Sequence, residues 1–275
     1  DTGWAVGRLA DGGVNRARAR SLGGCAEWQD GTVWGGELLR ATRAGFGRVG
    51  GLAAVPMPGG DKATTHPARL AAGTLYAADP DRVEATLKRH AVRFPGGDRE
   101  RDLVIQQLKA DVNTPQTSSA GRFLDAVAAL LGVCTRRTYE GEPAMKLEAV
   151  AARGSSHSLS ASISSLNGRS VINTPQLFAE LARLRSDGVS VPDTAATAQE
   201  TLARTLADLA IKEAEARNCE TVSLSGGVAY NEHIASRIRD RVSSDGLSFI
   251  TNRRVPPGDG GIAYGQLAVA AAQSS

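Results

Sequence analysis

The sequence predicts an α/β domain that carries an inserted helical region. Short apolar segments that indicate strands alternate with longer segments whose apolar residues recur at helical spacing. Two glycine-rich turns near the end of the chain each join a predicted strand to a predicted helix. With 275 residues, of which 41% are hydrophobic, the chain can form one large domain or two lobes around a sizeable core.

The first half of the chain predicts a hairpin followed by helices. Residues 1–30 are rich in glycine and arginine, so we expect them to be irregular and place the main domain at residues 31–275. Residues 33–40 and 45–52 are expected to pair as two strands. Apolar residues at helical spacing then predict helices at residues 66–77, 81–94, 100–109, 119–131 and 141–153.

The second half predicts one more hairpin, two helices and a β-α-β-α unit. Asn167-Gly168 is the dipeptide most favoured in tight hairpin turns, and it predicts a hairpin over residues 159–172. Helices are expected at residues 175–185, where Pro175 suits the first turn, and at 195–217. The final unit has predicted strands at 221–224 and 247–251 and predicted helices at 230–242 and 262–272.

Composition narrows the possible partners and the compartment. The net charge is +3, and basic residues are mixed with acidic ones, so we expect no nucleic-acid partner. No apolar run approaches the ~18 residues of a membrane span, and no secretory signal is visible. The three cysteines lack metal-site spacing, and we expect a cytoplasmic protein with reduced thiols. Because the chain begins at Asp1 rather than Met, we expect a fragment or processed form of a longer protein.

The two glycine turns of the final unit are the strongest functional signal. Ser225, Gly226 and Gly227 follow a predicted strand, and backbone N–H groups in such a turn can point outward toward an anion at the helix N-terminus. Asp259 stands before Gly260-Gly261 in the second turn. A lone Asp-Gly-Gly more often marks a helix cap, and a lone glycine turn more often only connects a strand to a helix. Their occurrence together favours a ligand site.

Six segments, in order, resemble the C-terminal domain of the HypF carbamoyltransferases of [NiFe]-hydrogenase maturation. That domain is related to the tRNA threonylcarbamoyl transferase TsaD and to TobZ-type antibiotic O-carbamoyltransferases. The resemblance extends roughly over residues 27–273. The segments are 30–37 (DGTVWGGE), 56–61 (PMPGGD), 117–132 (TSSAGRFLDAVAALLG), 139–142 (YEGE), 224–231 (LSGGVAYN) and 255–266 (VPPGDGGIAYGQ).

The resemblance implies a fold and a set of site residues. The fold would be the actin-like ATPase fold of the sugar kinases and TsaD, with mostly its second lobe present. The residues that it implies are Asp61 and Lys62 for catalysis, Ser225, Gly226, Gly227 and Asn231 for the nucleotide, Asp125 and Glu140 for its sugar, and Asp259 and Asp1 for a metal. From the residues alone, Asn231 either contacts the nucleotide or only caps the turn, and Asp125 is buried against a partner or exposed.

The histidines depart from the family pattern. The family carries a histidine-rich run whose imidazoles complete the metal site, whereas His66, His90, His157 and His233 are isolated here. No metal histidine is therefore transferred to this chain. Oxygen ligands with open water positions suit Mg²⁺, and added imidazoles suit Fe²⁺ or Zn²⁺, so the metal stays open.

The implied activity is carbamoyl transfer. The carbamoyl group of carbamoyl-adenylate, made from ATP by a YrdC-like domain upstream or in trans, would pass to the C-terminal cysteine of a HypE-type acceptor protein. Two alternatives remain: a small-molecule O-carbamoyltransferase of the TobZ kind, or an inactive nucleotide-binding scaffold, which the missing histidines favour. No membrane partner is expected.

Overall fold

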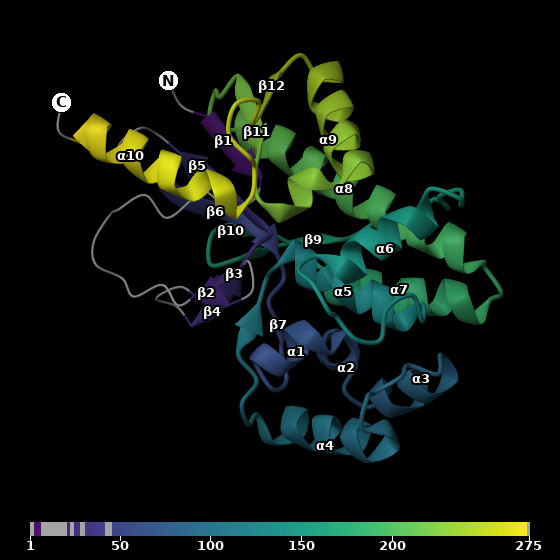
Figure 1. The fold of residues 1–275 in the computed structure, drawn as a ribbon. Helices are drawn as coiled ribbons and strands as arrows, with labels where there is room; N and C mark the ends of the chain where they lie inside the picture. The colour runs from purple at the N-terminus through teal and green to yellow at the C-terminus, as the bar shows by residue number, and fades with distance from the viewer. Residues whose placement is uncertain (1–2, 7–20, 23–24, 28–30, 42–45, 274–275) are drawn as a thin grey trace.

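The computed structural model describes residues 3–6, 21–22, 25–27, 31–41 and 46–273, and they form an α/β structure with two sheets (Figure 1). The strands of the larger sheet are β1 (Gly3–Val6), β5 (Glu37–Ala41), β6 (Phe46–Leu52), β9 (Ile163–Leu166), β10 (Arg169–Ile172), β11 (Thr221–Leu224) and β12 (Ser248–Thr251). Those of the smaller sheet are β2 (Ser21–Leu22), β3 (Cys25–Glu27), β4 (Thr32–Trp34), β7 (Val55–Pro56) and β8 (Gln116–Thr117).

The larger sheet brings the two ends of the chain together. Its order is β12-β11-β1-β5-β6-β10-β9. β1 pairs antiparallel with β5 and parallel with β11, and β11 pairs parallel with β12. The first strand therefore lies inside the sheet, next to the strand that leads into the first glycine turn.

Residues 1–30 were expected to be irregular because of their composition. The structure instead shows three short strands within this segment. β1, β2 and β3 are two to four residues long, too short for a periodic pattern in the sequence to reveal them. Asp1 lies outside the described residues. The proposed domain boundary at residue 30 stays a prediction.

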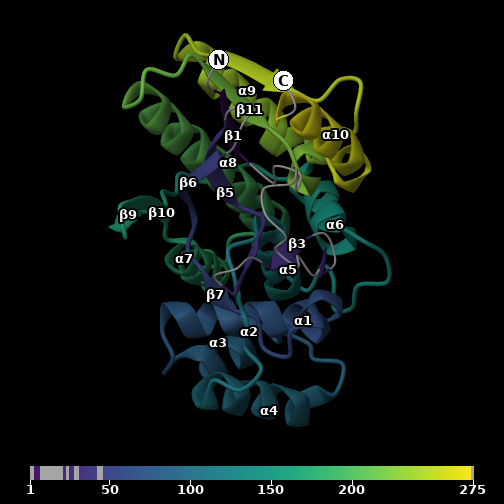
Figure 2. The same ribbon diagram turned by 90° about the vertical axis from the view of Figure 1, so that its left-hand side faces the viewer.

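Helices occupy most of the remaining chain and agree well with the expected order. They are α1 (Asp61–Thr65), α2 (Pro67–Ala78), α3 (Val83–Arg89), α4 (Gly97–Ala110), α5 (Ala120–Leu130), α6 (Glu142–Ala151), α7 (Thr174–Ser186), α8 (Val191–Glu215), α9 (Glu232–Ser244) and α10 (Ile262–Gln273), with 3₁₀ turns η1 (Gly227–Tyr230) and η2 (Asp259–Gly261). Figure 2 shows α1 to α4 gathered at one end of the molecule and α9 and α10 at the other.

Several boundaries differ from the prediction for local reasons. α8 begins at Val191 rather than residue 195, because the Ser190 side chain accepts a hydrogen bond from Asp193 N and caps the helix there. α9 begins at Glu232 rather than residue 230, because residues 227–230 form η1 and Asn231 caps the helix. Residues 32–34 belong to the smaller sheet, so only β5 and β6 form the expected hairpin.

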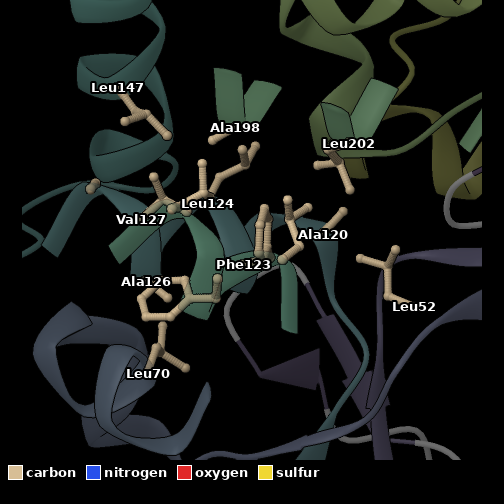
Figure 3. Close-up of a cluster of buried hydrophobic side chains, with 14 of the residues drawn as sticks. Leu52, Leu70, Ala120, Phe123, Leu124, Ala126, Val127, Leu147, Ala198 and Leu202 are labelled. Carbon is tan, nitrogen blue, oxygen red and sulfur yellow. The ribbon is translucent and has the colours of Figure 1, made fainter. Parts of the chain in front are cut away.

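α5 is the centre of the core. It contacts α2, α6, α7 and α8, and Leu124, Ala126 and Val127 are fully buried on it. Figure 3 shows these side chains meeting Leu70 of α2 and Leu147 of α6. A helix that is apolar around most of its surface is stable only when it is enclosed in this way. α8 in turn packs across β1, β6, β10 and β11, which joins the helical core to the larger sheet.

Candidate functional site

The first glycine turn is fixed against the second one. Gly226 has a φ of 99°, a backbone conformation that favours glycine. Its N–H and the hydroxyl of Ser225 both donate hydrogen bonds to the carbonyl of Pro257, at 2.7 and 3.1 Å. The Gly226 N–H therefore does not point outward, contrary to the expectation from the sequence. A Cβ on Gly227 would meet nothing within 4 Å, so open space lies on that side of the turn.

The second junction is packed closely on the first. A Cβ on Gly258 would lie 3.0 Å from Cε2 of Tyr230, the last residue of η1. Gly261 N–H donates to the Gly258 carbonyl at 3.0 Å and closes the η2 turn. A Cβ on Gly261 would collide with the carbonyl of Pro256. Gly258 thus leaves room for the Tyr230 ring, and Gly261 leaves room for the Pro256 carbonyl of its own loop. The expectation that these glycines make room for a ligand stays a prediction.

A hollow of about 400 Å³ opens where the two junctions meet. Parallel pairing puts the ends of β1, β11 and β12 at one edge of the sheet, with Leu224 opposite both Val6 and Thr251. The hollow is at this edge, the usual place for a ligand in an open α/β sheet. The residues lining it are Ser223, Ser225, Gly226, Ile250–Asp259, Gly261, Ile262, Tyr264 and Gly265.

Arg253 and Arg254 are the cationic side chains of this hollow, and the sequence reasoning missed them. Both are exposed on the loop between β12 and η2. Guanidinium groups match the geometry and charge of phosphate oxygens. The signal was available, because two arginines directly precede the Val-Pro-Pro segment that drew attention. Ser225, Gly226 and Asp259 line the same hollow, so the structure brings these three predicted residues together.

Asn231 caps a helix in the structure, and its contact with a nucleotide stays a prediction. Its side-chain oxygen accepts a hydrogen bond from Ile234 N at 2.9 Å, which caps α9. Its amide donates to the Gln199 oxygen on α8 at 3.1 Å. Both residues are buried, and neither lines the hollow. Asn231 thus fixes η1 and α9 to α8.

Asp125 is buried with a partner rather than exposed. Its carboxylate lies 2.9 Å from the Arg122 guanidinium, one turn earlier on α5, and only 1% of the residue is exposed. Burial raises the pKa of Asp125, and the charges of Arg122 and Arg137 oppose that shift. α5 also contacts η1, so Asp125 belongs to the helix that supports the first glycine turn.

Glu140 and Glu142 differ in their surroundings. Glu140 is exposed, whereas Glu142 is buried at the start of α6. Glu142 pairs with Lys146 at 2.7 Å and accepts a hydrogen bond from the Thr138 hydroxyl at 2.8 Å. The hydrogen bonds from Lys146 and then from Thr138 lower the pKa of Glu142 to about 2. Glu142 therefore orders its own turn, and Glu140 is the carboxylate that is open to solvent.

Asp61 and Lys62 are not brought near the hollow. They are exposed at the start of α1, after the tight Pro58-Gly59-Gly60 turn. Figures 1 and 2 both place α1 toward the opposite end of the molecule from α10.

A buried carboxylate that the sequence reasoning did not single out organises the segment at residues 30–37. Glu37 pairs with Arg48 at 3.1 Å and accepts hydrogen bonds from Gly35 N and Gly36 N at 2.5 and 2.9 Å. The Ser118 hydroxyl also donates to it. Burial, the largest influence, raises the pKa of Glu37, and the charge of Arg48 opposes it. Arg48 stacks on Trp34, with 4.6 Å from its guanidinium carbon to the ring centroid. This cluster joins the segment at residues 30–37 to the segment at residues 117–132 through the bond between Glu37 and Ser118.

The described residues do not form a metal site. No three His, Cys, Asp or Glu side chains among them lie together in a way that could hold an ion. His66 lies against Thr65, His90 against Ser186 and His233 against Glu200, each at 3.1 to 3.4 Å. Asp259 would supply a single carboxylate. The metal assignment of Asp259 and Asp1 therefore stays a prediction, and no chemical step is derived through a metal.

Comparison with known proteins identifies the class. Residues 24–266 match the family model of the "Carbamoyltransferase, Kae1-like Domain, second subdomain". The chain belongs to this family. None of the helices in the described part of the chain combines the length and the apolar character that are needed to cross a bilayer.

The similar proteins are HypF carbamoyltransferases. The chain is 35% identical to the probable carbamoyltransferase HypF of Methanocaldococcus jannaschii, over 90% of the chain and 31% of that protein. It is 38% identical to the carbamoyltransferase HypF of Rhodobacter capsulatus, over 92% of the chain and 32% of that protein. The chain thus spans about a third of the length of these relatives.

Solved structures confirm the fold class. The crystal structure of full-length HypF in a phosphate- and nucleotide-bound form superposes with a TM-score of 0.83 at 28% identity, over 98% of this chain and 33% of the other. HypF of T. kodakarensis gives a TM-score of 0.83 at 35% identity, over 100% and 34%. The TsaD-like, actin-like fold that was expected from the sequence is therefore confirmed.

Proposed function

We propose that this chain holds the adenine nucleotide of carbamoyl-adenylate in the hollow between its two glycine junctions. The observation that carries the proposal is the joining of these junctions through the Pro257 carbonyl, in a hollow that Arg253 and Arg254 also line. Gly227 does not line the hollow but has open space beside it on the same turn. The nucleotide-bound form of a similar HypF supports it.

Within this proposal the residues have distinct tasks. Gly226 and Gly227 leave room for a phosphate, and Ser225 and Asn231 hold the turn in place. Arg253 and Arg254 balance the phosphate charge. Asp125 and Glu140 are the proposed acceptors for ribose hydroxyls, because a carboxylate oxygen accepts two such hydrogen bonds. Reaching Asp125 requires a hydroxyl to approach its buried carboxylate beside Arg122.

The proposed reaction is transfer of the carbamoyl group to the C-terminal cysteine of a HypE-type protein. The acceptor thiolate attacks the carbamoyl carbon, a carbon–sulfur bond forms, and the carbon–oxygen bond to AMP breaks. Negative charge develops on the leaving phosphate, where fixed cationic groups lower the barrier. The chain's part is to hold and orient the AMP moiety, and a YrdC-like domain upstream or in trans supplies the adenylate.

The catalytic role of Asp61 and Lys62, which lie outside the hollow, stays a prediction from the family resemblance alone. They are exposed on a tight turn, so they are accessible to an acceptor protein that approaches the chain from that end. Transfer to a small-molecule hydroxyl, as in TobZ-type enzymes, would use the same nucleotide hollow and differ only in the acceptor.

Calorimetric titration with ADP tests the nucleotide assignment. Gly226→Val should abolish binding, because Gly226 lines the hollow and its φ of 99° is a backbone conformation that valine rarely adopts. Gly246→Val is the matched control, since Gly246 also has a positive φ, 84°, but lies at the α9–β12 turn with nothing within 4 Å of its Cβ. Equal ADP affinity in a folded Gly226→Val protein would refute the site.

Mass spectrometry tests the transfer. A HypE-type C-terminal peptide should gain a carbamoyl group when the chain is combined with an adenylate-forming domain, carbamoyl phosphate and ATP, and should gain none with the chain by itself. Carbamoylation of a hydroxyl compound in place of the peptide would identify the TobZ-type alternative.

A further inference from the structure

A second hollow, distant from the nucleotide hollow, is formed where three helices end. It has a volume of about 700 Å³ and is lined by Arg89, His90, Ala91, Arg93, Leu130, Leu131, Gly132, Arg185 and Ser186. We call it the arginine hollow. In Figures 1 and 2, α3 and α7, which contribute to it, lie on the side of the molecule away from α10.

Three arginines, Arg89, Arg93 and Arg185, line this hollow. Arg183, on the same helix as Arg185, pairs with both Glu180 and Asp187. In contrast, no carboxylate of the described residues forms an ion pair with Arg89, Arg93 or Arg185. Three positive charges thus share one concave surface without a carboxylate partner, and the Arg185 guanidinium donates a hydrogen bond to the Val189 carbonyl.

Helix dipoles account for only part of this arrangement. Arg89 ends α3 and Arg185 lies in the last turn of α7, where a cation is favourable. Arg93 lies beyond the end of α3, outside the range of that effect. Burial, and then the charges of Arg185 and Arg89, lower the pKa of His90, which faces the same hollow.

Two residues that line the hollow, Ala91 and Gly132, have the left-handed backbone conformation. Ala91 has a φ of 49° and Gly132 a φ of 68°, and they turn the chain sharply after α3 and α5. An alanine in this conformation is uncommon and carries strain of the kind often found at ligand sites. The buried side chains of Leu130 and Leu131 form an apolar part of the lining, next to the polar part formed by the arginines, His90 and Ser186.

We propose that the arginine hollow is a second anion site, which binds a small phosphorylated molecule. Its volume falls in the usual range for small-molecule sites, roughly 300–1,000 Å³. Guanidinium groups bind phosphate oxygens in pairs, and the apolar lining suits the organic part of a phosphate ester. This site is independent of the proposed nucleotide hollow.

Calorimetric titration with inorganic pyrophosphate at low ionic strength tests the proposal. The double variant Arg89→Gln/Arg93→Gln should lose about tenfold or more in affinity, because two charge-assisted contacts are removed. The control is Arg99→Gln/Arg153→Gln, which removes the same charge from two exposed arginines outside the hollow and should bind as the unaltered chain does.

The other outcomes are equally decisive. Equal losses in both double variants would show unspecific attraction by net charge and overturn the site. Loss only in Arg253→Gln/Arg254→Gln would place pyrophosphate in the nucleotide hollow and also overturn it. Tighter binding of a hexaglutamate peptide than of pyrophosphate, lost in Arg89→Gln/Arg93→Gln, would replace the small phosphate ligand with an acidic protein segment.

Discussion

Replacement of Asn231 by alanine separates a structural role from a binding role. The change removes the cap of α9, which costs about 1 kcal/mol, and leaves the buried Gln199 amide oxygen without its donor, which costs about 1–3 kcal/mol. The unfolding free energy should therefore fall by about 2–4 kcal/mol. At about 2–4 °C for each kcal/mol in a chain of this size, the melting temperature should fall by roughly 4–16 °C.

Two further variants isolate the terms of this loss. Ser190→Ala removes only a helix cap, at the start of α8, and should lower the melting temperature by roughly 2–4 °C. Adding Gln199→Leu to Asn231→Ala should recover about 1 kcal/mol or more, because no buried amide is then left unpaired. The assay is thermal melting by circular dichroism, with ADP calorimetry well below the transition.

The structural role is refuted if Asn231→Ala changes ADP affinity but not the melting temperature. If Asn231→Ala melts within about 2 °C of the unaltered chain and loses about tenfold or more in ADP affinity, then Asn231 is a nucleotide ligand and not a tether between α8 and α9.

Three other perturbations have defined outcomes. Gly227→Leu should lower ADP affinity by about 100-fold, equivalent to about 2.7 kcal/mol. The melting temperature should change little, since nothing lies within 4 Å of a Cβ at this position. Unchanged ADP affinity would exclude the open space at Gly227 as a ligand position. Gly36→Ala should destabilise the chain by about 1–3 kcal/mol, because the added Cβ would lie 2.5 Å from the Ser118 carbonyl oxygen. Gly47→Ala is the control, since a Cβ there meets nothing within 4 Å and should not destabilise the chain. Equal melting temperatures of the two variants would contradict the close packing at Gly36. Glu142 contributes stability above pH 4.5 that is lost as the pH falls toward its folded-state pKa of about 2, so acid titration of Glu142→Gln should show a smaller loss of stability across that window.

The parts of the fold that the sequence predicted well are those with a local cause. Ser119 caps α5, Asn167-Gly168 turns the hairpin of β9 and β10, and Pro175 opens α7, each through chemistry contained in a few neighbouring residues. The strand β1 was missed, because its place in the sheet depends on pairing with β11, more than 200 residues later in the chain.

The sequence likewise predicted only those parts of the candidate site that have a local pattern. The glycines of both junctions were singled out as a ligand site, and the structure shows Gly226 and Gly261 lining one hollow. The inward bond of Gly226 N–H to Pro257 and the pairing of Asn231 with Gln199 were not foreseeable, because each joins segments about 30 residues apart. Arg253 and Arg254 directly precede the Val-Pro-Pro segment in the sequence, but only the structure shows that they line the hollow.

A crystal structure of the chain with AMP bound tests the central claim most directly. The proposal predicts the phosphate beside Gly227 and within hydrogen-bond distance of Arg253 or Arg254, in the hollow between the two glycine junctions. AMP bound at any other place, including the arginine hollow, would contradict it.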